Sequence, residues 1–323
     1  MAPLSLAELR EAAALVAAAL PSTPQYRWPL LAERVGAEVW VKHENHLPVG
    51  AFKVRGGVFL MDRLRKEGVT HVVAATRGNH GQSVAFAASR CGIRATIVVP
   101  EGNSPTKNRA MRSLGAVLVE SGRDFQAAFE VAERLAKEER ASFFPSFSLD
   151  LVRGVASYAL ELFGAAGELD VVYVPVGLGS GICGTLAARD ALRLRTQVVG
   201  VVSERADCYA RSFAERRSVA TESADTLADG LAVRVPNREA LEWILAGVDR
   251  FVAVSEDEIL AAMRHYFDDT HSVAEGAGAA PLAAALRERS RIAGRRVGLV
   301  LSGGNVDAEL FSKALGEKPS ARP

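Results

Sequence analysis

Four short polar segments of this sequence contain residue types that could bind a ligand or catalyse a reaction, and each follows a hydrophobic run. The first is the segment 50–57, GAFKVRGG, in which Lys53 follows a glycine turn and precedes a predicted helix over 54–66. A lysine at that position lies near the positive end of the helix dipole, which disfavours the ammonium form and favours a nearby anion such as phosphate. A neutral amine is what a Schiff base requires. For any single lysine, however, a solvated side chain at a helix start is the more common explanation.

The second segment, 74–82 (AATRGNHGQ), connects the end of a predicted strand to a predicted helix over 83–89. Its backbone N–H groups could face an anion, and Asn79 could point into the crevice where open α/β sheets bind ligands. A simple helix N-cap at Asn79 is an equally good interpretation of this segment alone.

The third segment, 174–184 (VPVGLGSGICG), has three glycines within five residues after a predicted strand. Such a loop can wrap a phosphate without Cβ clashes, and the hydroxyl of Ser180 can add a donor. A dinucleotide site is the competing interpretation. Residues 179–184 fit G-x-G-x-x-G, and Glu204 follows about 20 residues further on, where a ribose contact is expected.

The fourth segment, 301–307 (LSGGNVD), places Ser302 directly after a predicted strand. Its hydroxyl could hydrogen-bond a ring nitrogen in the same crevice. Taken alone, the segment is more simply a turn with an Asx-type hydrogen bond.

The hydrophobic runs between these segments alternate with helix-like stretches, which predicts an α/β fold with two open parallel-sheet lobes and helices on both faces. The chain of 323 residues, 49% of them hydrophobic, is long enough for two such lobes. The predicted strands are 39–42, 71–75, 95–99, 117–120, 171–176, 197–202 and 297–301, and a helix is predicted over 125–138.

Composition excludes several classes of function. Lys plus Arg number 39 against 38 Asp plus Glu, so the net charge of +1 gives no reason to expect nucleic acid or a membrane surface as a partner. Cys91, Cys183 and Cys208 have no paired spacing, which argues against disulfides and thiolate metal sites. Residues 1–20 predict an amphipathic helix rather than a signal peptide, so the cytoplasm is the expected location and a small molecule the expected partner.

Taken together and in this order, the four segments resemble the serine/threonine dehydratase and serine racemase family of fold-type II enzymes that use pyridoxal 5'-phosphate. The likeness covers nearly the whole chain and includes three weaker markers: Lys107 with Gly115-Ala116, the segment 227–230 (LADG) and the segment 275–279 (EGAGA). The resemblance implies a large cofactor-binding domain of residues 1–47 and 148–323, a small domain of residues 48–147, and a homodimer.

The resemblance also implies a role for each residue of the four segments. Lys53 is expected to hold the cofactor as a Schiff base and then to act as the base at Cα. The expected cofactor contacts are Phe52, Lys53, Asn79, Gly177, Leu178, Gly179, Ser180, Gly181 and Ser302. The expected substrate contacts are Thr76, Arg77, Asn79 and His80. The implied reaction removes water from a β-hydroxy-α-amino acid and gives a 2-oxo acid and ammonia, with Ser302 favouring elimination because its hydroxyl is uncharged.

Several positions depart from the family pattern. Arg77 stands where a small residue is usual, Ala51 replaces a serine, residues 154–157 (GVAS) replace a common GQGT, and Leu178 interrupts a glycine run. These changes surround the substrate, so threonine, serine and a bulkier aryl serine such as phenylserine all remain open, as do 3-hydroxyaspartate dehydration and racemisation. No metal site is expected. Two hypotheses from different classes are an NAD(P)-dependent oxidoreductase that uses residues 179–184 and a binding protein that has lost the chemistry.

Overall fold

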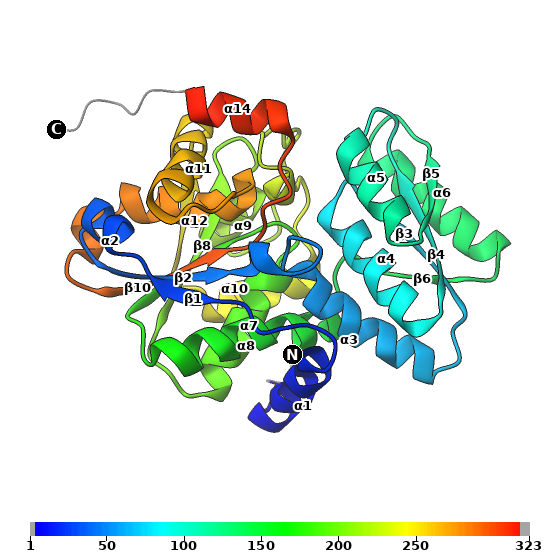
Figure 1. Cartoon of the computed structure of the whole chain (residues 1–323), viewed down its shortest axis with the longest axis horizontal. Helices are drawn as coiled ribbons and strands as arrows, with labels where there is room; N and C mark the ends of the chain where they lie inside the picture. The colour runs from blue at the N-terminus through cyan, green and yellow to red at the C-terminus, as the bar shows by residue number, and fades with distance from the viewer. Residues whose placement is uncertain (1–3, 317–323) are drawn as a thin grey trace.

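The computed structural model describes residues 4–316, which form two lobes that are each built on their own β-sheet (Figure 1). The larger sheet has six strands in the order β1-β2-β10-β7-β8-β9, and the smaller has four in the order β5-β4-β3-β6. The chain leaves the large sheet after β2, builds the whole small sheet, and returns at β7. The fold predicted from the sequence, two parallel-sheet lobes of the α/β class, is therefore confirmed.

The large sheet is parallel except at one edge. Its strands are β1 (Gln25–Arg27), β2 (Glu38–His43), β7 (Val171–Pro175), β8 (Gln197–Ser203), β9 (Arg250–Val254) and β10 (Arg296–Leu301). The edge strand β1 pairs antiparallel with β2, while β2, β10, β7, β8 and β9 run parallel. Strands β7, β8 and β10 are almost wholly buried, as expected for a parallel sheet that is covered on both faces.

Two layers of helices cover the large sheet. One hydrophobic core joins its strands to α2, α11, α12 and α14, and a second core on the other face joins them to α7, α8 and α10. The helices of this lobe are α1 (Leu6–Ala17), α2 (Pro29–Val35), α7 (Leu149–Ala166), α8 (Ser180–Ala191), α9 (Cys208–Glu215), α10 (Arg238–Gly247), α11 (Glu256–Thr270), α12 (Gly276–Arg287), α13 (Arg289–Ile292) and α14 (Ala308–Gly316), with short 3-10 turns η1 (Glu44–His46) and η2 (Asp229–Leu231).

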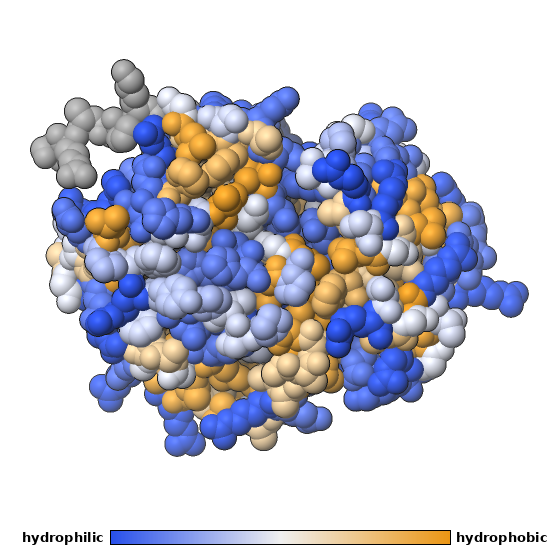
Figure 2. Space-filling view, viewed as in Figure 1, coloured by the Kyte–Doolittle hydropathy of each residue, from blue (hydrophilic) through white to orange (hydrophobic). Residues whose placement is uncertain are grey.

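The small sheet is parallel throughout and is also covered on both faces. Its strands are β3 (His71–Ala75), β4 (Arg94–Val99), β5 (Val117–Glu120) and β6 (Ser142–Phe143). One core contains residues of α6 (Phe125–Glu138), and the other contains residues of α3 (Lys53–Lys66), α4 (Asn79–Cys91) and α5 (Pro105–Ser113). In the view of Figure 2, polar side chains cover much of both lobes, and hydrophobic ones lie where the lobes meet and in separate patches on each lobe.

A buried ionic cluster fixes the start of α3 against the large lobe. The Arg55 guanidinium donates to the Glu44 carboxylate at 2.6 Å and to Glu161 of α7 at 2.8 Å. The Lys42 ammonium donates to the same Glu161 carboxylate at 2.5 Å. Removal of one member of such a buried pair leaves an uncompensated charge, which typically costs about 3–5 kcal/mol. Because Lys53 lies two residues before Arg55 on the same helix, the cluster also fixes the position of the Lys53 backbone.

The strands predicted from the sequence agree with the structure to within one residue at each end. The predicted helix over 83–89 is too short, because α4 begins at Asn79 within the polar glycine segment. Strands β1, β6 and β9 were not predicted. Among residues 4–316, no helix is long and apolar enough to cross a membrane.

Candidate active site

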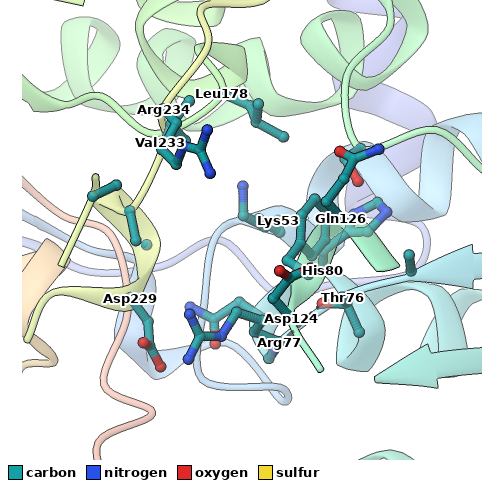
Figure 3. Close-up of a pocket in the computed structure, with 18 of the residues that line it drawn as sticks. Lys53, Thr76, Arg77, His80, Asp124, Gln126, Leu178, Asp229, Val233 and Arg234 are labelled. Carbon is teal, nitrogen blue, oxygen red and sulfur yellow. Dashed lines mark hydrogen bonds between the residues drawn. The ribbon is translucent and has the colours of Figure 1, made fainter. Parts of the chain in front are cut away.

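A cavity of about 650 Å³ opens between the two lobes. The small lobe contributes Lys53, the turn from Ala75 to His80, Lys107 and the start of α6, while the large lobe contributes Leu178, Ala224, residues 229–230 and 232–235, and Glu275. Its volume lies within the range of small-molecule sites. Figure 3 shows the Lys53 side chain in the middle of this pocket, with Leu178 and Arg234 on one side and Arg77 and Asp229 on the other.

The Lys53 amine is the one lysine amine at the centre of this pocket. Within the described residues it has no hydrogen-bond or ion-pair partner, and it lies 4.9 Å from the centre of the Phe52 ring. Burial lowers the pKa of Lys53, and the carboxylate of Glu275 opposes this shift only in part. A lysine in such surroundings has a larger neutral fraction than an exposed one, and a neutral amine is a nucleophile and a base.

The segment after β3 forms a turn that leaves several backbone donors free. The Thr76 hydroxyl accepts hydrogen bonds from the N–H groups of Gly78 at 3.0 Å and Gly81 at 3.1 Å, which closes the turn. In the described part of the chain, the N–H groups of Arg77, Asn79 and His80 have no acceptor. These free donors at the start of a helix of 13 residues form a site suited to an anion such as a carboxylate.

The Asn79 side chain connects the two lobes. Its amide donates to the Glu275 carboxylate oxygens at 2.8 and 3.0 Å, and its own oxygen accepts from Asn305 at 2.8 Å. The possible role of Asn79 as an N-cap is wrong, because Gly78 occupies the cap position and no side chain caps α4. Glu275 is the N-cap residue of α12, and burial raises the pKa of its carboxyl, while the bond from Asn79 lowers it.

The glycine loop from Gly177 to Gly181 leads into α8 and exposes a second set of donors. The N–H groups of four residues of this loop donate no hydrogen bond within the described residues: Leu178, Gly179, Ser180 and Gly181. A Cβ on Gly177 would lie 2.1 Å from the carbonyl oxygen of Gly230, and Gly179 has a φ of +102° with Ala240 only 2.6 Å from the position of a Cβ. Both positions therefore require glycine. Leu178 is the member of this loop that lines the pocket.

Ser302 and Phe52 lie beside Lys53 without lining the cavity itself. The carbonyl of Ser302 accepts from the Phe52 N–H at 3.0 Å, and Ser302 is a buried residue whose hydroxyl makes no hydrogen bond among residues 4–316. The Phe52 ring packs edge-on against Tyr158 with ring centres 6.1 Å apart. A Cβ on Gly181 would lie 3.5 Å from the Phe52 ring, so Phe52 lies between Lys53 and the start of α8.

Two further predicted site residues, Arg77 and His80, line the pocket in different ways. Arg77 is exposed, and none of the described acidic side chains pairs with it. His80 is buried against Phe144, and burial lowers its pKa to about 3, so its imidazole is neutral at physiological pH. The buried Nε2 atom of His80 has no hydrogen-bond partner in the described residues.

The structure thus brings Lys53, Thr76, Arg77, Asn79, His80 and Leu178 to one cavity, with the rest of the glycine loop, Phe52 and Ser302 around it. Sequence reasoning missed Arg234 and Val233, which line the cavity from a segment without a motif. Glu275, Lys107 and Asp229 have only weak sequence signals, as minor markers of a family pattern. Among the described residues, no cluster of three or more His, Cys, Asp or Glu side chains could hold a metal ion.

Comparisons with known proteins identify relatives over almost the full chain. A model of a family described as pyridoxal-phosphate dependent enzymes matches residues 16–303. An L-threonine ammonia-lyase from Thermotoga maritima is 34% identical over 317 residues, which cover 97% of this chain and 78% of the relative. The solved structure of a processed threonine deaminase isoform from Solanum lycopersicum has a TM-score of 0.89 and 28% identity, and the match covers 97% of this chain and 94% of that one. Maize serine racemase has a TM-score of 0.90 and 27% identity, and the match covers 97% of each chain.

Proposed function

Because the chain belongs to the family of pyridoxal-phosphate dependent enzymes, and is an ammonia-lyase of that family, we propose that it removes water from a β-hydroxy-α-amino acid. The predicted resemblance to the serine/threonine dehydratase and racemase family is confirmed by the same relatives. In the proposed reaction the substrate loses its β-hydroxyl as water, the product takes up one water when its C–N bond breaks, and a 2-oxo acid and ammonium are released. The Lys53 amine at the centre of the pocket is the observation that carries this proposal.

The residues present fit pyridoxal 5'-phosphate. The free N–H groups at the start of α8 would hold its phosphate, and Gly177 and Gly179 allow the loop its tight course, because a Cβ at either position would collide with neighbouring atoms. Lys53 would hold the cofactor covalently through its unpaired amine. Asn79 would exchange one of its two amide contacts with Glu275 for the phenolic oxygen, and the hydroxyl of Ser302 would face the ring nitrogen.

Lys53 is also proposed to move the reacting proton. When bound, the cofactor supplies an electron sink that stabilises negative charge at Cα of the substrate. The Lys53 amine then accepts the Cα proton, a task for which its lowered pKa suits it. The uncharged hydroxyl of Ser302, rather than a carboxylate, favours loss of the β-hydroxyl over transfer of the amino group.

The substrate carboxylate is proposed to bind at the start of α4. The free N–H groups of Asn79 and His80 point to an anion there, and the helix dipole adds to the attraction. Arg77 lines the same pocket and has no acidic partner in the described chain, so its guanidinium is available for that carboxylate.

The substrate side chain is proposed to be larger than the methyl group of threonine. The large lobe lines the cavity with apolar side chains: Leu178, Ala224, Ala232, Val233 and Val235. Phe125 lines the cavity from the small lobe, and Arg234 lies on the same side as Leu178, where a guanidinium can stack on an aromatic ring (Figure 3). These walls favour an aryl serine such as phenylserine, while the relatives named for threonine support threonine as a second substrate.

Two measurements test the reaction and the substrate. The purified protein with cofactor should absorb in the violet region, and borohydride should bleach that band and label Lys53. A panel of serine, threonine, phenylserine and 3-hydroxyaspartate should release 2-oxo acid, with the largest kcat/KM for phenylserine. Lys53→Ala should abolish both signals, whereas Lys66→Ala, which removes an exposed lysine on the same helix, should leave them unchanged. A protein that binds the cofactor but releases no 2-oxo acid from any of the four would contradict the proposal.

A dinucleotide-dependent reaction has less support. The family match gives no reason to place a dinucleotide at residues 179–184, and the Glu204 carboxylate, the expected ribose contact, instead pairs with Arg287 at 2.9 Å. The substrate panel distinguishes 3-hydroxyaspartate dehydration, whereas racemisation, which releases no 2-oxo acid, is detected by chiral analysis of the recovered amino acids. A cytoplasmic location and a homodimer stay predictions from the sequence.

A further inference from the structure

Lys107 joins the two lobes beside the pocket. It lies on α5 of the small lobe with its side chain largely buried, and its ammonium donates to the Asp229 carboxylate of the large lobe at 2.5 Å. Asp229 is the first residue of η2, within the segment that walls the pocket. A second contact between the lobes starts from the same helix end, since the Ser104 hydroxyl donates to Asp307 at 2.7 Å.

The aliphatic part of the Lys107 side chain packs against Gly78, in the turn that leads into α4. A Cβ added to Gly78 would lie 3.1 Å from the Lys107 Cδ atom and 3.6 Å from its Cε atom. Gly78 is the N-cap of α4, whose free N–H groups form the proposed carboxylate site. The position of this turn therefore depends on where the Lys107 side chain lies.

On the other side of the ion pair, the residue after Asp229 supports the glycine loop. A Cβ on Gly177 would lie 2.1 Å from the Gly230 carbonyl oxygen, so these two backbones are in direct contact. A Cβ on Gly230 would itself lie 2.8 Å from Ala277 of α12, which leaves the segment little room to move. Asp229 thus belongs to a rigid support of the proposed phosphate site.

We propose that Lys107 is a positioning residue, which sets the distance between the start of α4 and the glycine loop through its ion pair with Asp229. The two loops have to bind the same cofactor and substrate, and the Lys107 side chain contacts the turn before α4 at one end and Asp229, beside the glycine loop, at the other. The largely buried ammonium holds this spacing because it would lose its partner, the half-exposed Asp229 carboxylate, if the lobes moved apart. The assignment of the two loops to a carboxylate and a phosphate rests on the proposed function, whereas the mechanical coupling of the two loops through Lys107 does not.

The test compares Lys107→Met with Lys107→Arg, Asp229→Asn and the double variant K107M/D229N. The control is Arg112→Met, which removes the exposed Arg112–Glu120 ion pair from the same helix. In K107M holoenzyme, KM for the best substrate of the panel should rise tenfold or more while kcat changes by less than about threefold, a split expected when binding geometry is lost before chemistry. Lys107→Arg should restore most of the KM, and the double variant should be no worse than K107M alone.

Hydrogen exchange gives a readout that does not depend on turnover. In K107M holoenzyme, exchange should rise in peptides that cover residues 76–82 and 226–232 and stay unchanged in peptides from the core strands β7 and β8. Arg112→Met should change neither region. A normal KM, or a rise in exchange that is spread over the whole chain, would overturn the positioning role. If the wild-type protein converts no amino acid of the panel, the proposed function fails, and the exchange experiment still decides whether Lys107 couples the loops.

Discussion

The side chains of Asn79 and Glu275 meet across the boundary of the two lobes, 196 residues apart in sequence, with the amide nitrogen 2.8 Å from one carboxylate oxygen. Each of the two residues begins a helix at the pocket, since Asn79 opens α4 and Glu275 caps α12. This contact therefore ties the proposed carboxylate site of the small lobe to the large lobe directly.

Removal of the Glu275 carboxyl should weaken the folded state. Glu275→Ala leaves the partly buried Asn79 amide without its acceptor, which typically costs about 1–3 kcal/mol in the free energy of unfolding. Glu275→Gln keeps one acceptor oxygen and should cost less. Urea unfolding of both variants and of N79A/E275A checks this. If the double variant lost the sum of the two single losses, the residues would not be coupled and the contact would not contribute.

Much of the fold could be predicted from local patterns. The strands of a parallel sheet are continuous hydrophobic runs, so β3 and β5 were predicted with the correct bounds. The start of α4 was missed because Gly78, Asn79 and His80 have the composition of a loop. The helix begins at Asn79, directly after the cap residue Gly78, where the Thr76 hydroxyl closes the turn by accepting from the N–H groups of Gly78 and Gly81, a contact that no periodicity reveals.

The candidate site was predictable where a motif marks it and not elsewhere. Lys53, Asn79, the glycine loop and Ser302 stand in short segments with glycine turns after predicted strands, whereas Arg234 stands in a segment without a motif. The contact between Asn79 and Glu275 depends on how the two lobes pack, which sequence spacing does not reveal.

The glycine loop should tolerate no side chain at Gly177. Gly177→Ala would push a methyl group into the Gly230 carbonyl, at a distance of 2.1 Å before any relaxation, and so deform the proposed phosphate site. Cofactor affinity, measured by fluorescence titration of the apo protein, should fall at least tenfold, or about 1.4 kcal/mol. Gly164→Ala is the matched control, because nothing lies within 4 Å of a Cβ there. Equal affinities for the two variants would contradict the proposed phosphate site.

The protein should lose stability as the pH falls below about 6.5. Burial lowers the pKa of His43 and His80 to about 3 and that of His265 to about 4, whereas an unfolded histidine titrates near 6.5. Between about pH 6 and 5 the unfolded chain therefore binds up to three more protons at these positions. Burial raises the pKa of Glu275, so proton uptake by this carboxyl in the folded chain works against the difference.

An excess of one to three protons predicts that the free energy of unfolding falls by about 1.4–4 kcal/mol per pH unit in this window and is retained above about pH 7. Urea unfolding at about pH 7.5, 6 and 5 measures the slope. His265→Gln removes one of the three histidines and should flatten the slope by about 1.4 kcal/mol per unit. A stability that stays constant down to pH 5 would show that these histidines are protonated in the folded protein.

Arg77 should contribute to substrate binding rather than to the reaction step. Its guanidinium lines the pocket next to the free N–H groups of Asn79 and His80, and none of the described carboxylates neutralises it. Arg77→Ala should raise KM for the true substrate by tenfold or more, about 1.4 kcal/mol, while kcat changes little. Arg77→Lys keeps the charge but loses the two-point contact with a carboxylate, so its KM should lie between the two.

The substrate panel identifies the group that Arg77 meets. If the guanidinium binds the α-carboxylate, KM rises by a similar factor for threonine, serine and phenylserine, because all three carry that group in the same place. If it stacks on an aromatic ring, the loss is confined to phenylserine, and Arg77 rather than Arg234 faces the substrate side chain. An unchanged KM for every substrate would mean that the Arg77 side chain points into water and that the backbone donors of α4 bind the carboxylate alone.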